Sequence, residues 1–539
     1  MRKAQIFRTA LEAVLLSTAA TADQSCTKET FSDLSLSGGE ILDIAAFAVN
    51  NFSLPADPSL AVNHYPEAVT GLSACGVNVT YTHAGQNDTI NTWVWLPEDW
   101  NGRLMGVGGA GWRTGNYWAI PHAASKGFAA VATDGGHYAE IDPSTVDRNT
   151  WGLKSKGNVD WNLLQDFASI TLDDAATLGK AAAKAFYGES VKRSYWNGCS
   201  TGGRQGHMMA QKYPHQYDGI LATAPAINWE RWLLNNAYTQ SFAAVNDAYT
   251  PLCELNAFQA AAIEACDEID GVKDGIIMDP DSCSFDAATV VGQSYNCSTG
   301  PSGTLSSKGA SVFTVATSPF VPEDSSLVNG RPFAYGLELG SALWAVANTT
   351  CVYGANETSV TCTRAPFNVS IEWIQNYLAK DASFNVFNLT HPDYETLFRQ
   401  SIDQYSSIIG ASNPDLTEFK KAGGKLITWH GLADEFIPPN GTIEYWEKVQ
   451  RQDPEVDDYY RLFSAPGVGH CFSTNAPGWY PGDVLDALIN WVEGGVVPDT
   501  LEAKTVGLAK ERSANLCKWP KRLIYEGGDG DLASSYSCA

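Results

Sequence analysis

From about residue 90 onward, short apolar stretches rich in β-branched residues alternate with longer stretches whose apolar positions recur at helical spacing. The strand-like stretches are 92–96, 103–107, 127–132, 194–196, 219–223, 425–429 and 459–463. The helix-like stretches lie around 166–185, 203–212 and 481–494. Because this alternation builds a mostly parallel sheet flanked by helices, the pattern predicts the α/β class.

The alternation stops between residues 228 and 405. This part of the chain holds Gly-, Ser- and Pro-rich stretches at 298–308 and 319–332, together with six cysteines. We predict that residues 228–405 form an inserted lid domain, and that residues 23–227 and 406–539 together form the domain that contains the sheet.

Composition narrows the class of partner. The chain has 539 residues, 44% of them hydrophobic, which excludes disorder as its main state. Its 35 basic and 60 acidic residues give a net charge of −25, with no run rich in Lys and Arg. Because phosphate neutralisation needs clustered cations, we expect neither a nucleic acid nor an anionic membrane as partner. A small molecule or a neutral polymer fits better, and no feature of the sequence specifies an oligomeric state.

The first residues have the organisation of a signal peptide. Arg2, Lys3 and Arg8 precede the apolar stretch 10–20, and residues 20–22, Ala-Thr-Ala, supply the small-x-small pattern that a signal peptidase cleaves. We predict that residues 1–22 are removed and that the protein is secreted and extracellular. No later stretch reaches the about 18 uninterrupted apolar residues of a membrane span.

The cysteines and sequons agree with this compartment. All twelve cysteines follow the predicted signal peptide, and an even number is expected for oxidised pairs. Close spacing favours four local pairs, with Cys253 and Cys297 left over: Cys351 with Cys362, Cys517 with Cys538, Cys266 with Cys283 and Cys26 with Cys75. Asn-x-Ser/Thr sequons, typical of a surface glycoprotein, lie at Asn51, Asn78, Asn87, Asn296, Asn348, Asn356, Asn368, Asn388 and Asn440.

The most specific motif is Gly198-Cys-Ser200-Thr-Gly202, which stands between a predicted strand and a predicted helix. In a nucleophile elbow the serine sits on a strained strand-to-helix turn, and small residues two positions before and after it let the backbone bend. The alternative is a serine that only caps the helix. The order of strand, motif and helix favours a nucleophilic Ser200.

A nucleophilic serine needs a histidine base that a carboxylate orients. In an α/β-hydrolase the acid follows a late strand and the histidine follows the last one. Asp434 and His470 follow the last two predicted strands in that order. We therefore predict Ser200, Asp434 and His470 as the catalytic residues of an α/β-hydrolase, with Glu435 as the rival acid. The other eight histidines are expected to be structural or at the surface.

Two cysteines flank these residues. Cys199 immediately precedes Ser200, and Cys471 immediately follows His470. A disulfide between them would hold the nucleophile and the base in register, and a misplacement of about 1 Å can cost around a hundredfold in rate. The alternative is a pair of unrelated structural cysteines.

The set Cys199-Ser200, Asp434 and His470-Cys471 resembles the signature of the tannase/feruloyl esterase family of fungal and bacterial α/β-hydrolases. The resemblance spans nearly the whole mature chain and includes the segments 198–206, 222–226, 265–275, 423–426, 430–434 and 517–522. It implies a secreted serine carboxylesterase whose inserted lid shapes the acyl pocket. The implied substrates are small aromatic esters or plant cell-wall esters of phenolic acids.

Acyl transfer also needs N–H donors for the oxyanion that develops on the substrate. In this fold one donor is the backbone N–H of the residue after the nucleophile, here Thr201, and the other comes from an early glycine-rich turn. Residues 106–111 are the candidate turn, and we select Gly109 within it. The alternative is a flexible turn without a catalytic role.

Asp267, Asp270 and Asp274 place three carboxylates within eight residues of the predicted lid. Hard oxygen ligands at this density suit calcium, although a solvated acidic turn is the alternative. The resemblance implies a calcium ion held by these aspartates and by the backbone carbonyls of Val272 and Ile276. We expect the ion to be structural, because serine acyl transfer needs neither a Lewis acid nor an organic cofactor.

Three functions follow from these observations. The first is a feruloyl or other hydroxycinnamoyl esterase that forms an acyl-enzyme on Ser200, and the second is a tannase that acts on galloyl esters. The third is a non-catalytic protein that binds cell-wall glycans, which the 17 tryptophans and the sequons would permit. The ordered serine, acid and histidine argue against the third.

Overall fold

The structure is a computed structural model that describes residues 25–57, 62–137, 151–298, 300–324, 331–354, 360–471 and 477–539. The predicted signal peptide, residues 1–22, and the sequon at Asn356 lie outside these residues. All twelve cysteines lie within them and form six disulfides. Five were expected, namely Cys26–Cys75, Cys199–Cys471, Cys266–Cys283, Cys351–Cys362 and Cys517–Cys538, and the two cysteines left over form the sixth, Cys253–Cys297.

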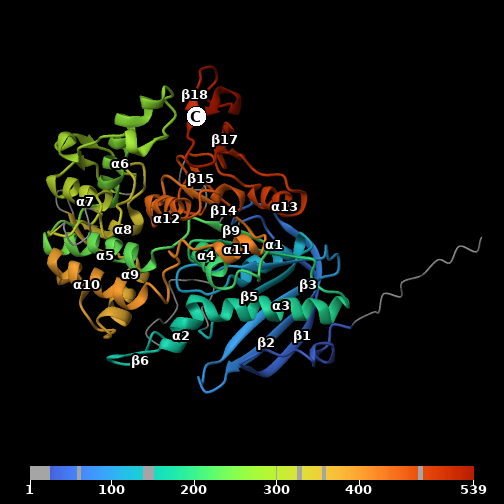
Figure 1. The fold of residues 1–539 in the computed structure, drawn as a ribbon. Helices are drawn as coiled ribbons and strands as arrows, with labels where there is room; N and C mark the ends of the chain where they lie inside the picture. Colours follow the sequence, from blue (N-terminus) through green and yellow to red (C-terminus); the bar gives the residue numbers. More distant parts are fainter. Residues whose placement is uncertain are drawn as a thin grey trace, which may run out of the picture.

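A nine-stranded sheet runs through the molecule in the order β1-β2-β3-β5-β4-β8-β9-β14-β15 (Figure 1). The pairings from β1 to β5 are antiparallel, and those from β5 to β15 are parallel. The strands are β1 (Gly39–Leu54), β2 (Val69–His83), β3 (Ile90–Pro97), β4 (Arg103–Val107), β5 (Ala129–Thr133), β8 (Arg193–Cys199), β9 (Gly219–Thr223), β14 (Lys425–Gly431) and β15 (Tyr460–Ala465). The predicted α/β class, with a mostly parallel central sheet, is confirmed.

Helices cover both faces of this sheet. Successive strand residues point to opposite faces, so Leu104 packs in the apolar cluster that includes α3 and α4, whereas Met105 packs in the cluster that includes α1 and α13. The helices of this part are α1 (Ile120–Ser125), α2 (Trp161–Gln165), α3 (Thr171–Tyr187), α4 (Thr201–Lys212), α11 (Thr417–Lys421), α12 (Pro439–Gln452) and α13 (Val484–Gly494). Because helices cover both faces, β5 and β9 are buried along their whole length.

The two N-terminal strands, β1 and β2, were not among the predicted strands. β1 is at the edge of the sheet, and nearly all of its residues are exposed or half-buried. A strand in that position needs no continuous apolar run, so the chain carries a weak hydrophobic signal there.

Within residues 228–405, no described residue belongs to a strand of the nine-stranded sheet. The segment contains α5 (Trp229–Val245), α6 (Leu252–Cys266), α7 (Ser307–Thr317), α8 (Trp344–Ala347), α9 (Asn368–Glu372) and α10 (His391–Tyr405), with two hairpins, β10 (Ser294–Tyr295) with β11 (Gly303–Thr304) and β12 (Thr349–Tyr353) with β13 (Val360–Arg364). These helices gather on one side of the sheet (Figure 1). Of these helices, α5, α9 and α10 share an aromatic cluster with Trp112, which lies in the loop after β4, and the rings of Trp112 and Trp229 are 5.1 Å apart.

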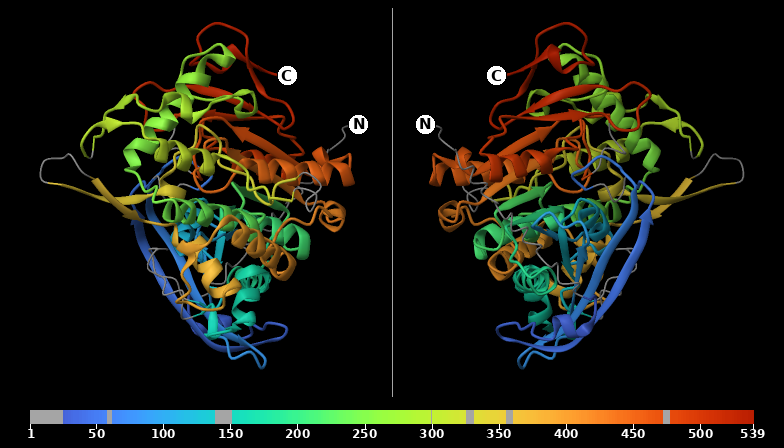
Figure 2. Two further views of the ribbon diagram at one scale, coloured as in Figure 1. Left: turned by 90° about the vertical axis from the view of Figure 1, so that its left-hand side faces the viewer. Right: turned by 90° about the vertical axis from the view of Figure 1, so that its right-hand side faces the viewer.

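Small hairpins complete the chain. They are β6 (Leu153–Ser155) with β7 (Asn158–Val159), β16 (Thr500–Lys504) with β17 (Ser513–Cys517), and β18 (Leu523–Tyr525) with β19 (Tyr536–Cys538). The C-terminal segment lies at the same end of the molecule as α6 (Figure 2), and Arg522 pairs there with Asp281 of the inserted segment at 2.9 Å. None of the described helices has the length and apolar character needed to cross a membrane.

Candidate active site

Ser200 occupies the turn between β8 and α4. Its backbone has φ 62° and ψ −121°, and its N–H donates to the carbonyl of Thr223 at 3.0 Å. A non-glycine residue with positive φ costs on the order of 1–3 kcal/mol and persists only where the surroundings enforce it. A Cβ atom on Gly198 would lie 2.5 Å from the carbonyl oxygen of Gly202, which explains why the turn needs glycine there. The structure therefore has the strained strand-to-helix turn that the motif predicts.

Asp434, just after β14, is fully buried and holds the side chain of His470, just after β15. Its Oδ2 accepts a hydrogen bond from His470 Nδ1 at 2.7 Å, and its Oδ1 accepts the N–H groups of Phe436 and Ile437 at 2.8 Å each. Burial alone would raise the pKa of Asp434. The charge of His470, followed by the hydrogen bonds from the side chains of His430 and His470, outweighs burial and holds this pKa well below its usual value. Burial likewise opposes the charged form of His470, and the charge of Asp434 outweighs it and raises the pKa of His470.

Glu435 contacts the histidine at a different atom. Its Oε2 accepts a hydrogen bond from the backbone N–H of His470 at 2.9 Å, whereas the ring of His470 hydrogen-bonds to Asp434. Burial, followed by the neighbouring charge of Asp434, raises the pKa of Glu435. The geometry thus favours Asp434 over Glu435 as the acid that orients the imidazole.

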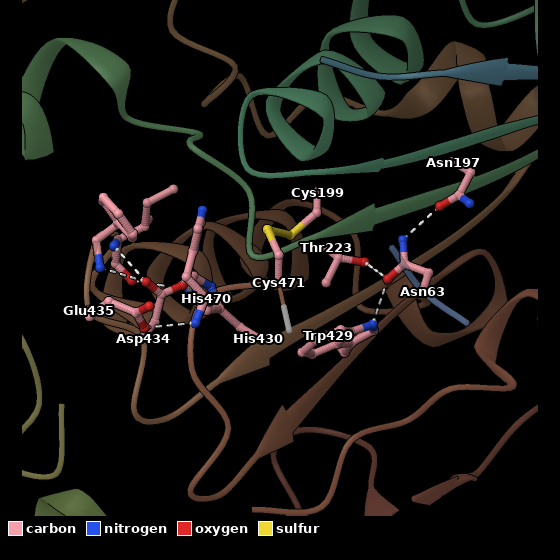
Figure 3. The surroundings of a disulfide bond; sticks show 12 residues. Asn63, Asn197, Cys199, Thr223, Trp429, His430, Asp434, Glu435, His470 and Cys471 are labelled. Carbon is pink, nitrogen blue, oxygen red and sulfur yellow. Dashed lines mark hydrogen bonds and ion pairs between the residues drawn. A yellow bond between two sulfur atoms is a disulfide. The ribbon is translucent and has the colours of Figure 1, made fainter. Parts of the chain in front are cut away.

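The Cys199–Cys471 disulfide joins the residue before Ser200 to the residue after His470, with the two Cα atoms 5.9 Å apart (Figure 3). The two loops come from positions 272 residues apart in the chain. Ser200 and His470 line one cavity together. The bond therefore restrains the separation of their backbones.

Asn63, in the segment between β1 and β2, was not singled out from the sequence. Its Nδ2 donates to Asn197 Oδ1 at 2.6 Å, and its Oδ1 accepts from Thr223 Oγ1 at 2.6 Å and from Trp429 Nε1 at 2.9 Å (Figure 3). These partners belong to β8, β9 and β14. Asn63 thereby links the strands from which the site is built, and a lone asparagine with positive φ carries no motif that would reveal this.

His430, the sixth residue of β14, is a second histidine on Asp434. Its Nε2 lies 3.0 Å from Asp434 Oδ2 and 3.1 Å from the carbonyl oxygen of Ile437, while its Nδ1 lies 2.9 Å from Thr442 Oγ1. Because both neighbours of Nε2 are acceptors, this nitrogen carries the proton and donates. A structural or surface imidazole was expected here, and His430 is buried and contacts the predicted acid. Its position four residues before Asp434 was the available signal for this contact.

Of the two predicted oxyanion donors, only Thr201 has a free backbone N–H. Thr201 is the first residue of α4, and its N–H has no acceptor among the described residues. Gly109 N–H instead donates to the buried Gln205 Oε1 at 3.0 Å, so the prediction for Gly109 is wrong. The next residue, Ala110, lines the cavity with Ser200, and its N–H has no acceptor within the described part of the chain.

The cavity over Ser200 and His470 has a volume of about 800 Å³. This size is typical of sites for small organic ligands. Aromatic side chains, four of them from residues 228–405, form much of its wall: Trp229, Trp232, Trp344, Phe367 and Phe436. Flat apolar walls of this kind pack well against an aromatic ring.

The predicted calcium ligands lie in the loop after α6. Asp267 Oδ1 accepts the N–H groups of Asp274 and Gly275, and Asp270 Oδ1 accepts that of Val272. The second oxygens of Asp270 and Asp274 are buried without a hydrogen-bond partner, although Arg512 Nη1 lies 3.1 Å from Asp274 Oδ2.

Burial is the main cause that raises the pKa of Asp270 and that of Asp274, the latter to about 6. A cation would relieve both the burial cost and the mutual repulsion. The donor set and its electrostatics therefore fit a calcium ion.

The chain is similar to known proteins over most of its length. The family model described as tannase and feruloyl esterase matches residues 75–539. A probable feruloyl esterase from Arthroderma benhamiae is 37% identical over 511 residues, which cover 93% of this chain and 91% of that protein. A tannase from Aspergillus oryzae is 27% identical, with 92% of each chain covered. The solved structure of a tannin acyl hydrolase from Aspergillus niger superimposes with a TM-score of 0.83 at 28% identity, covering 95% of each chain.

Proposed function

We propose that this chain, which belongs to the tannase and feruloyl esterase family and is a carboxylic ester hydrolase, is a secreted serine esterase. Its proposed substrates are hydroxycinnamoyl esters. The observation that carries the mechanism is the Asp434–His470 hydrogen bond of 2.7 Å, tied by the Cys199–Cys471 disulfide to the strained Ser200 turn. These groups border one aromatic-walled cavity.

In the acylation step, Ser200 Oγ attacks the carbonyl carbon of the ester, and His470 Nε2 takes the hydroxyl proton. Asp434 accepts a hydrogen bond from the protonated Nδ1 of His470, which leaves Nε2 unprotonated in the neutral ring and stabilises the imidazolium that forms. The N–H groups of Thr201 and Ala110 stabilise the oxyanion. When the tetrahedral intermediate that carries this oxyanion collapses, the ester C–O bond breaks and the alcohol leaves with the proton from His470. The acyl group stays on Ser200.

Deacylation repeats these steps with water as the nucleophile. His470 takes a proton from the water, whose oxygen attacks the acyl carbon, and then returns that proton to Ser200 Oγ as the acid is released. The raised pKa of His470 sets the acid limb of the activity, because only the neutral imidazole can accept a proton.

The apolar wall of the cavity favours a hydroxycinnamoyl acyl group over a galloyl group. A galloyl ring carries three hydroxyl groups that lose water on burial and each need a polar partner. A feruloyl group has one hydroxyl, a methoxy group and an apolar propenyl linker, which suit the walls formed by Trp229, Trp232 and Phe367. The 37% identity to a relative named as a probable feruloyl esterase, against 27% to the tannase, supports the same choice.

A tannase is the second candidate. The overlay with the tannin acyl hydrolase, at a TM-score of 0.83 over 95% of each chain, favours it. Both candidates use the same residues, so the acyl group of the preferred substrate decides between them.

Secretion and a calcium ion are parts of the same proposal. Six disulfides and five exposed sequon asparagines, Asn51, Asn87, Asn296, Asn368 and Asn388, support an oxidising, extracellular setting. Asp270 Oδ2, which is buried without a hydrogen-bond partner, and the buried Asp274 Oδ2, which pairs with Arg512, support a structural calcium ion in the loop after α6. Carbonyls of Val272 and Ile276 would complete its oxygen ligands.

The deciding experiment compares hydrolysis of methyl ferulate, methyl caffeate and methyl gallate by the secreted protein and by Ser200→Ala. We expect the cinnamates to be preferred, and Ser200→Ala to lower kcat by a factor on the order of 10⁶ with an unchanged thermal melt. Ser311→Ala, at an exposed serine of α7, is the matched control.

Preference for gallate would replace the first candidate by the tannase. Retained turnover in Ser200→Ala would refute the mechanism. Failure of the intact protein on all three esters would refute the substrate class.

A further inference from the structure

A second buried histidine lies among carboxylates away from Ser200. His83 is the last residue of β2, Asp88 follows it in the turn to β3, Asp166 precedes α3, and Asp174 lies in the first turn of α3. We call these four residues the His83 cluster. All are buried, with exposed fractions of 8% for His83, 7% for Asp88 and Asp174, and 0% for Asp166.

The imidazole of His83 contacts carboxylates through both ring nitrogens. Nδ1 lies 2.6 Å from Asp88 Oδ2 and 3.7 Å from Asp166 Oδ1, and Nε2 lies 2.9 Å from Asp174 Oδ2. One ligand atom each from His83, Asp88 and Asp166 lies within 4.8 Å of the others. Three ligand atoms that converge this closely can share one metal ion.

Asp166 supplies the independent sign that a ligand is needed. Both of its carboxylate oxygens are buried without a hydrogen-bond partner, and Oδ1 points at His83 Nδ1. Within the described residues, no lysine or arginine pairs with Asp88, Asp166 or Asp174. A carboxylate buried without a donor loses its hydration and gains no hydrogen bond in return. A cation between the carboxylates would offset that loss.

We propose that the His83 cluster is a structural site for a divalent transition-metal cation of the zinc or manganese class, with His83 Nδ1, Asp88 Oδ2 and Asp166 Oδ1 as its protein ligands. An imidazole nitrogen beside carboxylates suits these ions, whereas calcium takes oxygen ligands throughout. Asp174 accepts a hydrogen bond from Nε2 of His83, the kind of contact that orients most metal-binding histidines. A water molecule or Asp166 Oδ2 completes the coordination.

The site would tie the N-terminal strands to α3. Metal binding displaces the proton on His83 Nδ1 that otherwise lies between the ring and Asp88, so binding strengthens as pH rises. β2 is four strands from β8 in the sheet order, which corresponds to about 19 Å at about 4.8 Å per strand. The metal therefore acts on stability and does not contact the ester.

The test measures zinc, manganese and calcium by elemental analysis in the full-length secreted protein, before and after reconstitution with ZnCl₂ or MnCl₂ and gel filtration. We expect about one transition-metal ion per wild-type chain and a rise of the melting temperature on reconstitution. Asp166→Asn, which keeps the side-chain shape, should hold only background amounts of transition metal, and its melting temperature should not rise on reconstitution. Asp173→Asn, a neighbouring half-buried acid on α3 that pairs with Gln216, should behave as the wild type.

Cobalt substitution covers the case in which Asp166→Asn fails to fold. Co²⁺ in the wild-type cluster should give visible d–d absorption bands that added Zn²⁺ removes, and Asp88→Asn should lack them. A wild-type protein that holds no zinc, manganese or cobalt would overturn the proposal. So would a folded Asp166→Asn that binds as much metal as the wild type.

Discussion

Two buried groups near opposite edges of the nine-stranded sheet combine histidine and aspartate in opposite proportions. Around Asp434, a single carboxylate accepts four hydrogen bonds, two from the backbone and two from the imidazoles of His430 and His470. In the His83 cluster, a single imidazole lies among three carboxylates, and Asp166 keeps both oxygens without a partner.

The difference separates a site that moves a proton from one that would hold a cation. The negative charge of Asp434 is fully stabilised by hydrogen bonds, so the charge of His470 can change during a reaction without upsetting the fold. The His83 cluster has a surplus of negative charge, and both ring nitrogens are already occupied. No nitrogen of His83 is left to act as a base, whereas a metal ion would balance the cluster.

Among variants of these two groups, the largest effect should come from Asp434→Asn. Loss of the carboxylate removes the group that fixes the tautomer of His470, and we expect kcat to fall about 10⁴-fold. The carboxylate also raises the pKa of His470. Without it that pKa falls, so the acid limb of kcat/KM should move to lower pH. Steady-state kinetics on methyl ferulate across pH would check both effects.

Glu435→Gln is the matched control for this variant. A glutamine carbonyl oxygen can still accept the backbone N–H of His470, so the loss should stay within about tenfold, the worth of one hydrogen bond. If Glu435→Gln were as damaging as Asp434→Asn, the assignment of the orienting acid would be wrong.

The parts of the site that the sequence predicted are those that local motifs encode. Ser200 stands in a five-residue motif, and Asp434 and His470 each follow a recognisable strand, so chain order sufficed. The choice of Gly109 as an oxyanion donor failed because its N–H donates to the side chain of Gln205, which lies 96 positions further along the chain. No local pattern reports such a contact.

The His83 cluster could not be predicted for the same reason. His83 ends a strand that the hydrophobic pattern did not reveal, and Asp88 lies in the turn after it. Asp166 and Asp174 lie eight positions apart at the start of a helix. Only the antiparallel pairing of β2 with β3, together with the packing of α3 on β3, brings them together. The parallel part of the sheet was predictable because its strands are continuous apolar runs.

Chelators should separate the two metal proposals. Phenanthroline removes transition metals and should lower the melting temperature of the wild type but not of Asp166→Asn. EGTA also removes calcium, and this further loss should be absent in Asp274→Asn. A site occupied at 100 times its Kd contributes about 2.7 kcal/mol, which corresponds to a shift of a few degrees. If calcium alone reversed the effect of both reagents, the distinction between the sites would fail.

The smallest effect tests whether His430 helps to position Asp434. His430→Gln can return an N–H donor near the position of Nε2, whereas His430→Leu cannot, and loss of one hydrogen bond to the carboxylate corresponds to about tenfold in rate. We expect His430→Leu to lower kcat by that factor with KM unchanged, and His430→Gln to recover most of it. Equal losses in both variants, matched by equal drops in melting temperature, would mean that His430 only fills space beneath the site. A loss in kcat that glutamine restores would mean that Asp434 needs both of its imidazole donors, which is the feature that sets it apart from the carboxylates around His83.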